Sequence, residues 1–457
     1  MYINGNWVLS GMTIDVKNPG TGKVFRSVEF VGVKETEEAI EAAFDAFGKW
    51  SNLPAVKRAE YLERVAIKLK ENQEQIAQII SGEMGKPIAN SRVEVDKSVE
   101  YFKWFAEESR RVYGETIPAS VSNKRLMAIK QPVGVVAVIT PWNHPLLMIA
   151  RKVAPALAAG CTVVVRPSNQ APCSAVELFR ILHECEFPQG VANLVIGHAD
   201  EISSTILKNK KVRKITFTGS TEVGKQLMKD AANSVKRVSM ELGGHAPFIV
   251  FEDADLDLAV AGAVSIKFGS SGQVCVSANR IYVHDHIYDE FEKRFIKKVA
   301  ELKVSDGLDE SCIVGPLINE RAIDTIQDQV DDAVQKGAKV LYGGHRLVEG
   351  EFARGSYYSP TVLSDVDDRM KIVHEETFGP VVPLIRFSSE EEVIQKANHL
   401  EYGLASYFYT NDLSRVYRVS EQLEYGIVGV NDSATSVVQA PFGGVKESGV
   451  GREGGHG

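Results

Sequence analysis

The sequence has little of what marks secreted, membrane-spanning or nucleic-acid-binding proteins. Its 457 residues include five cysteines and no Cys-x-x-Cys pair, which argues against a disulfide framework and for a reducing compartment. It has 52 basic against 60 acidic residues and no long basic block, so it lacks the clustered positive charge that nucleic-acid binding needs. The longest apolar stretch, residues 153–165, contains Pro155 and Gly160 and is too short to span a bilayer.

The N-terminal residues lack the basic segment and apolar core of a secretory signal, so we expect a cytoplasmic protein. Hydrophobic residues make up 44% and charged residues 25% of the chain, as in ordinary globular proteins. At about 150 residues per domain, the length predicts about three units or one large multidomain enzyme. His284 and His286 have no further ligand at a suitable spacing, so no metal site is predicted.

Hydrophobic periodicity predicts that the first hundred residues are mostly helical. Ile40, Phe44 and Phe47 have the i, i+4, i+7 spacing of one buried helix face. Pro54 suits the first turn of a second helix, and a further helical pattern runs through residues 95–102.

From residue 135, short β-branched runs alternate with helical segments. Strands are predicted at residues 135–140, 162–165, 193–196, 214–218 and 235–240, and helices at 145–159 and 172–184. Strands separated by helices of this length predict a mostly parallel sheet, and their continuous apolar character predicts that both faces are covered.

A second α/β series runs from residue 246 to 430. Its strands are predicted at residues 248–250, 280–283 and 382–387, and its helices at 289–301 and 320–335. The glycine-rich end, residues 441–457, is predicted to be a loop. Two α/β lobes would then face each other, and clefts between such lobes commonly hold ligands.

Four local patterns could carry chemistry, and each has a plain structural alternative. A strand ending at Thr218 turns through Gly219 into a helix, which suits a phosphate or is simply a capped turn. Cys275 is a nucleophile if helix-start amides lower its pKa, or else a small buried hydrophobic residue. Glu241 and Asn143 each follow a strand, where they could be a working carboxylate and an oxyanion donor, or a solvated acid and an Asx turn.

Taken together and in order, five motifs resemble those of the aldehyde dehydrogenase superfamily. They are Pro141-Trp142-Asn143, Phe217-Thr218-Gly219-Ser220, Glu241-Leu242-Gly243-Gly244, Gly272-Gln273-x-Cys275 and Glu376-x-Phe378-Gly379-Pro380. The resemblance extends from near residue 15 to the C-terminus, and the ordered set is far more specific than any one motif. It implies an α/β fold with a Rossmann-type cofactor domain, a second α/β catalytic domain and a small oligomerisation element.

The resemblance also implies domain boundaries. The cofactor-binding domain would comprise residues 1–115 and 132–241, the catalytic domain 242–430, and the oligomerisation element 116–131 and 431–457. A homodimer or homotetramer is expected. Family members generally continue past the Gly-Arg-Glu-Gly motif into a tail strand, and an end at Gly457 puts that strand in question.

The catalytic roles follow from the same resemblance. Cys275 would attack an aldehyde as thiolate, and the Asn143 amide with the Cys275 backbone N–H would hold the developing oxyanion. After hydride transfer to a nicotinamide, water activated by Glu241 would hydrolyse the thioester. Lys152 matches a lysine close to the active site of family members.

The resemblance implies NADP or NAD as cofactor. The residues expected to bind it are Thr140, Pro141, Trp142, Arg166, Ser168, Asn169, Gly219, Ser220, Leu242, Glu376 and Phe378. Arg166 stands where the family commonly has Lys, and Asn169 where NAD-selective members often place Glu. Without that carboxylate nothing repels a 2′-phosphate and Arg166 could bind one, so NADP is slightly favoured.

A closer resemblance is to the succinate-semialdehyde dehydrogenase branch, which grips a substrate carboxylate with arginines and a serine. Arg151 matches one arginine and Ser436 the serine, which predicts a short anionic aldehyde, first of all succinate semialdehyde. Gly269 replaces the second arginine, six residues before Cys275, so sulfolactaldehyde is a rival substrate. Ser277 replaces a second cysteine and excludes a disulfide switch there.

Two further alternatives concern the class of protein. A non-catalytic descendant of the fold, acting as a structural or binding protein, would have no need for Cys275, Glu241 and Asn143 together. An acylating enzyme would hand the thioester to coenzyme A, whereas Glu241 favours hydrolysis.

Overall fold

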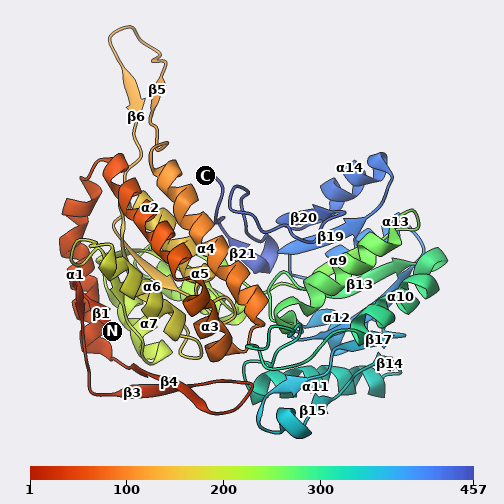
Figure 1. The fold of residues 1–457 in the computed structure, drawn as a ribbon. Helices are drawn as coiled ribbons and strands as arrows, with labels where there is room; N and C mark the ends of the chain where they lie inside the picture. Colours follow the sequence, from red (N-terminus) through yellow and green to blue (C-terminus); the bar gives the residue numbers. More distant parts are fainter. Residues whose placement is uncertain (457) are drawn as a thin grey trace.

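Two α/β lobes lie side by side in the computed structural model, which describes residues 1–456 (Figure 1). Residues up to β11 build the first lobe, and residues from β12 to about 430 build the second. Gly457, the last residue of the predicted 431–457 segment, lies outside the described residues.

The first lobe is built on an eight-stranded sheet of order β2-β1-β9-β8-β7-β10-β11-β21. Its parallel centre consists of β7 (Val135–Ile139), β8 (Thr162–Arg166), β9 (Ala192–Leu194), β10 (Val212–Thr218) and β11 (Arg237–Glu241). Three short strands pair antiparallel at the edges: β1 (Tyr2–Ile3), β2 (Asn6–Trp7) and β21 (Gly449–Val450). Every residue of β7 and β8 is buried, as continuous apolar strands require.

Eight helices belong to this lobe among the described residues. They are α1 (Val33–Ser51), α2 (Ala55–Glu71), α3 (Gln73–Met84), α4 (Ile88–Ser109), α5 (Leu147–Ala158), α6 (Cys173–Glu184), α7 (Ala199–Lys208) and α8 (Thr221–Ala232). Two hairpins stand apart from the main sheet: β3 (Thr13–Lys17) with β4 (Val24–Glu29), and β5 (Glu115–Ile117) with β6 (Leu126–Ala128). The second hairpin projects away from both lobes (Figure 1).

The second lobe has a seven-stranded sheet of order β14-β17-β18-β13-β12-β19-β20. Its strands are β12 (Ala246–Val250), β13 (Ala278–His284), β14 (Lys339–Tyr342), β17 (Thr361–Ser364), β18 (Val381–Phe387), β19 (Ala405–Tyr409) and β20 (Ile427–Val430), and only β14 runs antiparallel to its neighbour. Its helices are α9 (Leu256–Phe268), α10 (Tyr288–Ala300), α11 (Glu320–Gln335), α12 (Lys371–His374), α13 (Glu390–Asn398) and α14 (Leu413–Gln422), and β15 (Arg346–Leu347) pairs with β16 (Tyr357–Tyr358).

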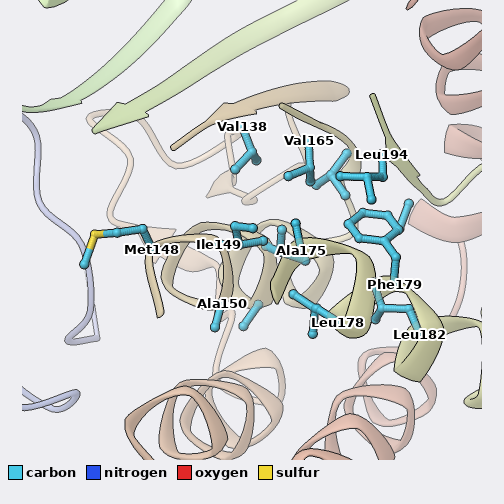
Figure 2. Close-up of a cluster of buried hydrophobic side chains, with 14 of the residues drawn as sticks. Val138, Met148, Ile149, Ala150, Val165, Ala175, Leu178, Phe179, Leu182 and Leu194 are labelled. Carbon is cyan, nitrogen blue, oxygen red and sulfur yellow. The ribbon is translucent and has the colours of Figure 1, made fainter. Parts of the chain in front are cut away.

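The core beneath the first sheet fixes the elements that carry the candidate site. In Figure 2, Val138, Val165 and Leu194 from three adjacent strands face Ile149 of α5 and Phe179 of α6, and all five are fully buried. Burying side chains of this size stabilises the fold by about 1.5–3 kcal/mol each. These contacts hold α5 against the end of β7 and so fix the positions at which the loop between β7 and α5 begins and ends.

Three local predictions were wrong. Ile40 is buried as predicted, but Phe44 is 45% exposed, because the rest of the buried face of α1 consists of small residues and Trp50. The Lys211 ammonium lies over the Phe44 ring at 4.7 Å. Val235 is 90% exposed with a φ of 49° in the turn after α8, so its strand begins only at Arg237. The C-terminal glycine-rich segment is not all loop, since β21 pairs with the edge of β11.

A helix that crosses a membrane needs about 20 consecutive, mainly apolar residues. Among residues 1–456, no helix combines the necessary length with an apolar enough composition.

Candidate functional site

The predicted motifs meet in one cavity between the two lobes, called here the motif cavity. Its lining comes from the carboxyl ends of β7, β10 and β11 and from the loops before β13 and after α12: Pro141, Trp142, Asn143, Met148, Thr218, Gly219, Ser220, Leu242, Gly243, Cys275, Glu376 and Phe378. Loops at the carboxyl ends of parallel strands are where α/β proteins bind ligands. Residues more than two hundred positions apart are therefore brought to a single site.

A second cavity, called here the arginine cavity, also has Cys275 in its lining. Arg151 and Ser436 line it together with Gly269 and Cys275. The Arg151 guanidinium donates to Ser436 Oγ at 3.2 Å and stacks on the Phe442 ring at 4.1 Å, and its Nε has no hydrogen-bond partner among the described residues. Cys275 is thus shared by a cavity of motif residues and a cavity with a buried cation.

Asn143 is fixed from both lobes. Its side-chain amide donates to the backbone carbonyl of Gln273 at 3.0 Å, two residues before Cys275. Its own backbone carbonyl accepts a hydrogen bond from Lys86 Nζ at 2.8 Å. Because a primary amide has two N–H donors, one donor remains for a ligand beside Cys275.

A buried charge cluster that the sequence analysis missed holds the Asn143 loop. Lys86 forms an ion pair with Glu94 of α4, and both side chains are almost completely buried. Glu94 also accepts from the backbone N–H groups of Leu146 and Leu147, at 3.0 and 3.1 Å, where α5 begins. Burial opposes ionisation of Glu94, but the charge of Lys86 and the hydrogen bond with His144 outweigh it and hold the pKa of Glu94 at about 2.

Cys275 does not lie at a helix start, so the predicted lowering of its pKa by helix amides was wrong. It occupies a turn between a 3-10 helix (Gly269–Gly272) and β13. Burial and the negative charge of Glu376 raise the pKa of the thiol to about 12, while Arg151 acts in the opposite direction. The thiol is therefore protonated at neutral pH in the protein without ligands.

Glu241 and Lys152 lie next to each other but line neither of these two cavities. Glu241 is 3% exposed and its Oε2 has no hydrogen-bond partner among the described residues. Lys152 forms a buried ion pair with Glu453. Burial and the charge of Glu453 raise the pKa of Glu241 well above its usual value. Gly443 allows this packing, since a Cβ there would lie 2.7 Å from Glu241 Oε1.

Glu376 and Phe378 take up defined positions in the motif cavity. Glu376 accepts a hydrogen bond from the backbone N–H of Gly244 at 3.1 Å, and burial raises its pKa to about 7. Phe378 has a φ of 49° and meets Trp142 edge to face, with ring centroids 5.6 Å apart. Ser220 is the N-cap of α8, its Oγ accepting from the N–H of Val223 at 3.4 Å.

The remaining predicted cofactor residues lie near the carboxyl end of β8, outside the lining of the motif cavity. Arg166 donates to Asn169 Oδ1 at 3.3 Å, and Asn169 in turn donates to the carbonyl of Gly197 at 3.0 Å. Thr140 is adjacent, since its N–H donates to the carbonyl of Arg166 at 3.2 Å, and Ser168 Oγ accepts from the N–H of Gln170.

A metal site needs several ligand side chains close together, and the structure describes residues 1–456. No group of three or more His, Cys, Asp or Glu among them is arranged to hold a metal ion.

The charge cluster yields a prediction for stability. Glu94→Gln keeps the size of the side chain but leaves the Lys86 ammonium buried without a counter-ion, so we expect a loss of about 3 kcal/mol in urea unfolding at neutral pH. Because the pKa of Glu94 is lowered on folding, its contribution should vanish as the pH falls through about 2. Glu74→Gln, which removes an exposed partner of Arg92, is the control and should change little. Equal stability of both variants would contradict the role of Glu94.

The raised pKa of Cys275 yields a prediction for reactivity. We expect iodoacetamide to label Cys275 slowly at neutral pH in the ligand-free protein, with a rate rising about tenfold per pH unit on the alkaline side. Peptide mass spectrometry identifies the labelled cysteine, and Cys275→Ser gives the background. A rate that levels off near neutral pH would show that the protein stabilises the thiolate after all.

Comparison with known proteins gives the family. A model of the aldehyde dehydrogenase family matches residues 7–457. The glutarate-semialdehyde dehydrogenase of Pseudomonas putida is 50% identical over 455 residues, covering 99% of this chain and 94% of that protein. The 3-sulfolactaldehyde dehydrogenase of Pseudomonas putida is also 50% identical, covering 99% and 93%. The NADP(+) succinate-semialdehyde dehydrogenase of Escherichia coli is 48% identical, covering 99% and 93%.

The fold agrees with that of a solved relative. The crystal structure of an Escherichia coli NADP-dependent enzyme matches with a TM-score of 0.98 and 48% identity, over 100% of this chain and 94% of that one. The predicted fold class and family resemblance are therefore confirmed. The chain belongs to the aldehyde dehydrogenase family.

Proposed function

We propose that this protein oxidises short anionic aldehydes to carboxylic acids with NADP or NAD as hydride acceptor. One observation carries the proposal: Cys275 lines both the motif cavity and the arginine cavity. A substrate held by its anionic end at Arg151 would place its aldehyde at the thiol. Succinate semialdehyde is the first candidate, and the names of the relatives include the semialdehydes of succinate and glutarate.

The fit of a nicotinamide cofactor is supported by unpaired groups at the strand ends. Thr140 Oγ1 and Thr218 Oγ1 are buried without hydrogen-bond partners among the described residues, and Thr218 lines the motif cavity. Glu376 and Phe378 would hold the ribose and the ring, and Gly219 and Ser220 would face the pyrophosphate. When bound, the oxidised nicotinamide supplies a hydride acceptor and a positive charge beside the thiol.

The chemistry at Cys275 then follows from the geometry. The thiolate would attack the aldehyde carbon, and the free N–H of the Asn143 amide with the Cys275 backbone N–H would stabilise the oxyanion. Loss of hydride leaves a thioester on the sulfur. Glu241 would take a proton from the water that hydrolyses it, and burial raises the pKa of this carboxyl, which makes its carboxylate a stronger base. Lys152 is expected to act through its contact with Glu453.

A preference for NADP is part of the proposal. Arg166 has an Nε without a hydrogen-bond partner among the described residues, and Asn169 beside it carries no charge to repel a 2′-phosphate. With Ser168 they would surround the adenosine ribose. The Escherichia coli relatives are described as NADP enzymes.

We further propose that the protein is a cytoplasmic homodimer or homotetramer. The β5–β6 hairpin projects into solvent and exposes Ile117, Leu126 and Met127 (Figure 1). Residues 116–131 would form the oligomerisation element together with 431–457, alongside the cofactor domain (1–115 and 132–241) and the catalytic domain (242–430).

Sulfolactaldehyde is a second candidate substrate. Gly269 leaves open space in the arginine cavity, since a Cβ at this position would meet no atom within 4 Å. A sulfonate is bulkier than a carboxylate, and a relative of equal identity is named for sulfolactaldehyde.

Initial rates test the proposed function. With NADP and with NAD, we expect succinate semialdehyde or sulfolactaldehyde to give a higher kcat/KM than neutral butanal, because only the anions pair with Arg151. Cys275→Ala should abolish turnover. A preference for butanal, or undiminished turnover by Cys275→Ala, would refute the proposal. Release of acyl-CoA in place of free acid would identify an acylating enzyme, and no activity together with an unreactive Cys275 would favour a binding protein.

The proposed role of Glu241 has its own test. Glu241→Gln should lower kcat by roughly a hundredfold or more while still producing one equivalent of reduced cofactor per site, because only hydrolysis is impaired. Intact-protein mass spectrometry should find the acyl group on Cys275. The wild-type kcat should rise with pH as Glu241 loses its proton, and the variant should lack this rise. If Glu241→Gln produced no initial equivalent of reduced cofactor, Glu241 would be needed at or before hydride transfer, and its proposed role in hydrolysis would be wrong.

A further inference from the structure

Helix α4 presents a second cation to the arginine cavity. Asn90, Val93, Glu94 and Lys97 line this cavity, at the i, i+3, i+4, i+7 spacing of one helix face. Tyr101 lies one turn further along, and the Arg151 guanidinium stacks on its ring at 5.3 Å. Lys97 of α4 and Arg151 of α5 therefore line the same cavity.

Lys97 has no partner of its own. Among residues 1–456, its ammonium group makes no hydrogen bond and no ion pair, although the side chain is half-buried. The buried Lys86 and Lys152, by contrast, each pair with a carboxylate. Burial and the charge of Arg151 lower the pKa of Lys97, which agrees with its position beside another cation in a poorly hydrated space.

The nearby carboxylates are already engaged. Glu94 binds Lys86, His144 and two backbone N–H groups. Glu453 binds Lys152, and its Oε2 also lies 3.8 Å from Arg151 Nε. Glu100 is exposed and lines no part of the cavity. Among residues 1–456, the one carboxylate that lines the arginine cavity is therefore that of Glu94, which is already engaged, and Lys97 is the cation without a carboxylate partner, so a ligand anion would complete the arrangement.

We propose that Lys97 is the second anion-binding residue of the arginine cavity and holds, with Arg151 and Ser436, the distal carboxylate or sulfonate of the aldehyde. This inference rests on the proposed function. Gly269 provides no side chain on its side of the cavity, so α4 supplies the second charge. An ammonium group is a compact charge whose N–H donors are not held in the fixed planar arrangement of a guanidinium. It can therefore bind planar carboxylates and tetrahedral sulfonates alike.

Steady-state kinetics of Lys97→Met test the proposal. The matched control is Lys103→Met, which removes an exposed lysine of the same helix. For succinate semialdehyde and sulfolactaldehyde, we expect Lys97→Met to raise KM roughly tenfold or more with little change in kcat, because one charge-assisted contact is lost. KM for butanal should stay the same, and Lys97→Arg should retain most of the affinity for the anions.

A binding measurement separates this inference from the proposed function. Succinate should protect Cys275 of the wild type and of Lys103→Met from iodoacetamide, and should protect Lys97→Met only at roughly tenfold higher concentration. If the wild type prefers anionic aldehydes but Lys97→Met matches Lys103→Met in both assays, the role of Lys97 is overturned and the proposed function stands. If the wild type prefers butanal and succinate gives no protection, the proposed function fails as well.

Discussion

The buried ion pair of Lys86 and Glu94 is the interaction on which the candidate site depends. Glu94 accepts the first backbone N–H groups of α5 and thereby fixes where that helix begins. Lys86 holds the backbone of Asn143, and the Asn143 side chain reaches across to Gln273 in the second lobe. A single charge pair on the first lobe thus sets the distance between an amide donor and the thiol two residues beyond Gln273.

Exclusion of water governs the chemistry of the same region. Burial raises the pKa values of Cys275, Glu241 and Glu376 and so favours the neutral form of each side chain. At neutral pH the Cys275 thiol of a ligand-free site is therefore expected to react slowly. Positive charge brought in by a bound cofactor, together with Arg151, would shift Cys275 toward the thiolate, which ties nucleophilicity to the presence of both reaction partners.

The sequence allowed the layout of the fold to be predicted, because β-branched runs and intervening helices are local signals. The motif residues were also predicted to converge, and Pro141, Gly219, Cys275 and Glu376 do line one cavity. The wrong predictions concern features that tertiary packing decides. The exposure of Phe44 and the turn around Cys275 depend on the segments that pack against them. The pairing of Lys86 with Glu94 was missed because it is also tertiary: a glutamate in a helix is usually solvated, and its neighbour Val93 is itself exposed.

How precisely a charged side chain can bind one ligand depends on the rigidity of the backbone element that carries it. Gly269 directly precedes Ser270 and Ser271, whose φ values of 49° and 60° mark a strained turn next to the nucleophile. A large cation on that turn would couple substrate binding to the backbone that positions Cys275. Lys97 instead projects from the middle of a 22-residue helix that packs on α2, α3 and α5. Because Glu94 of the same helix fixes Asn143, one rigid element would align the anionic end of a substrate with the group that stabilises its reacting end.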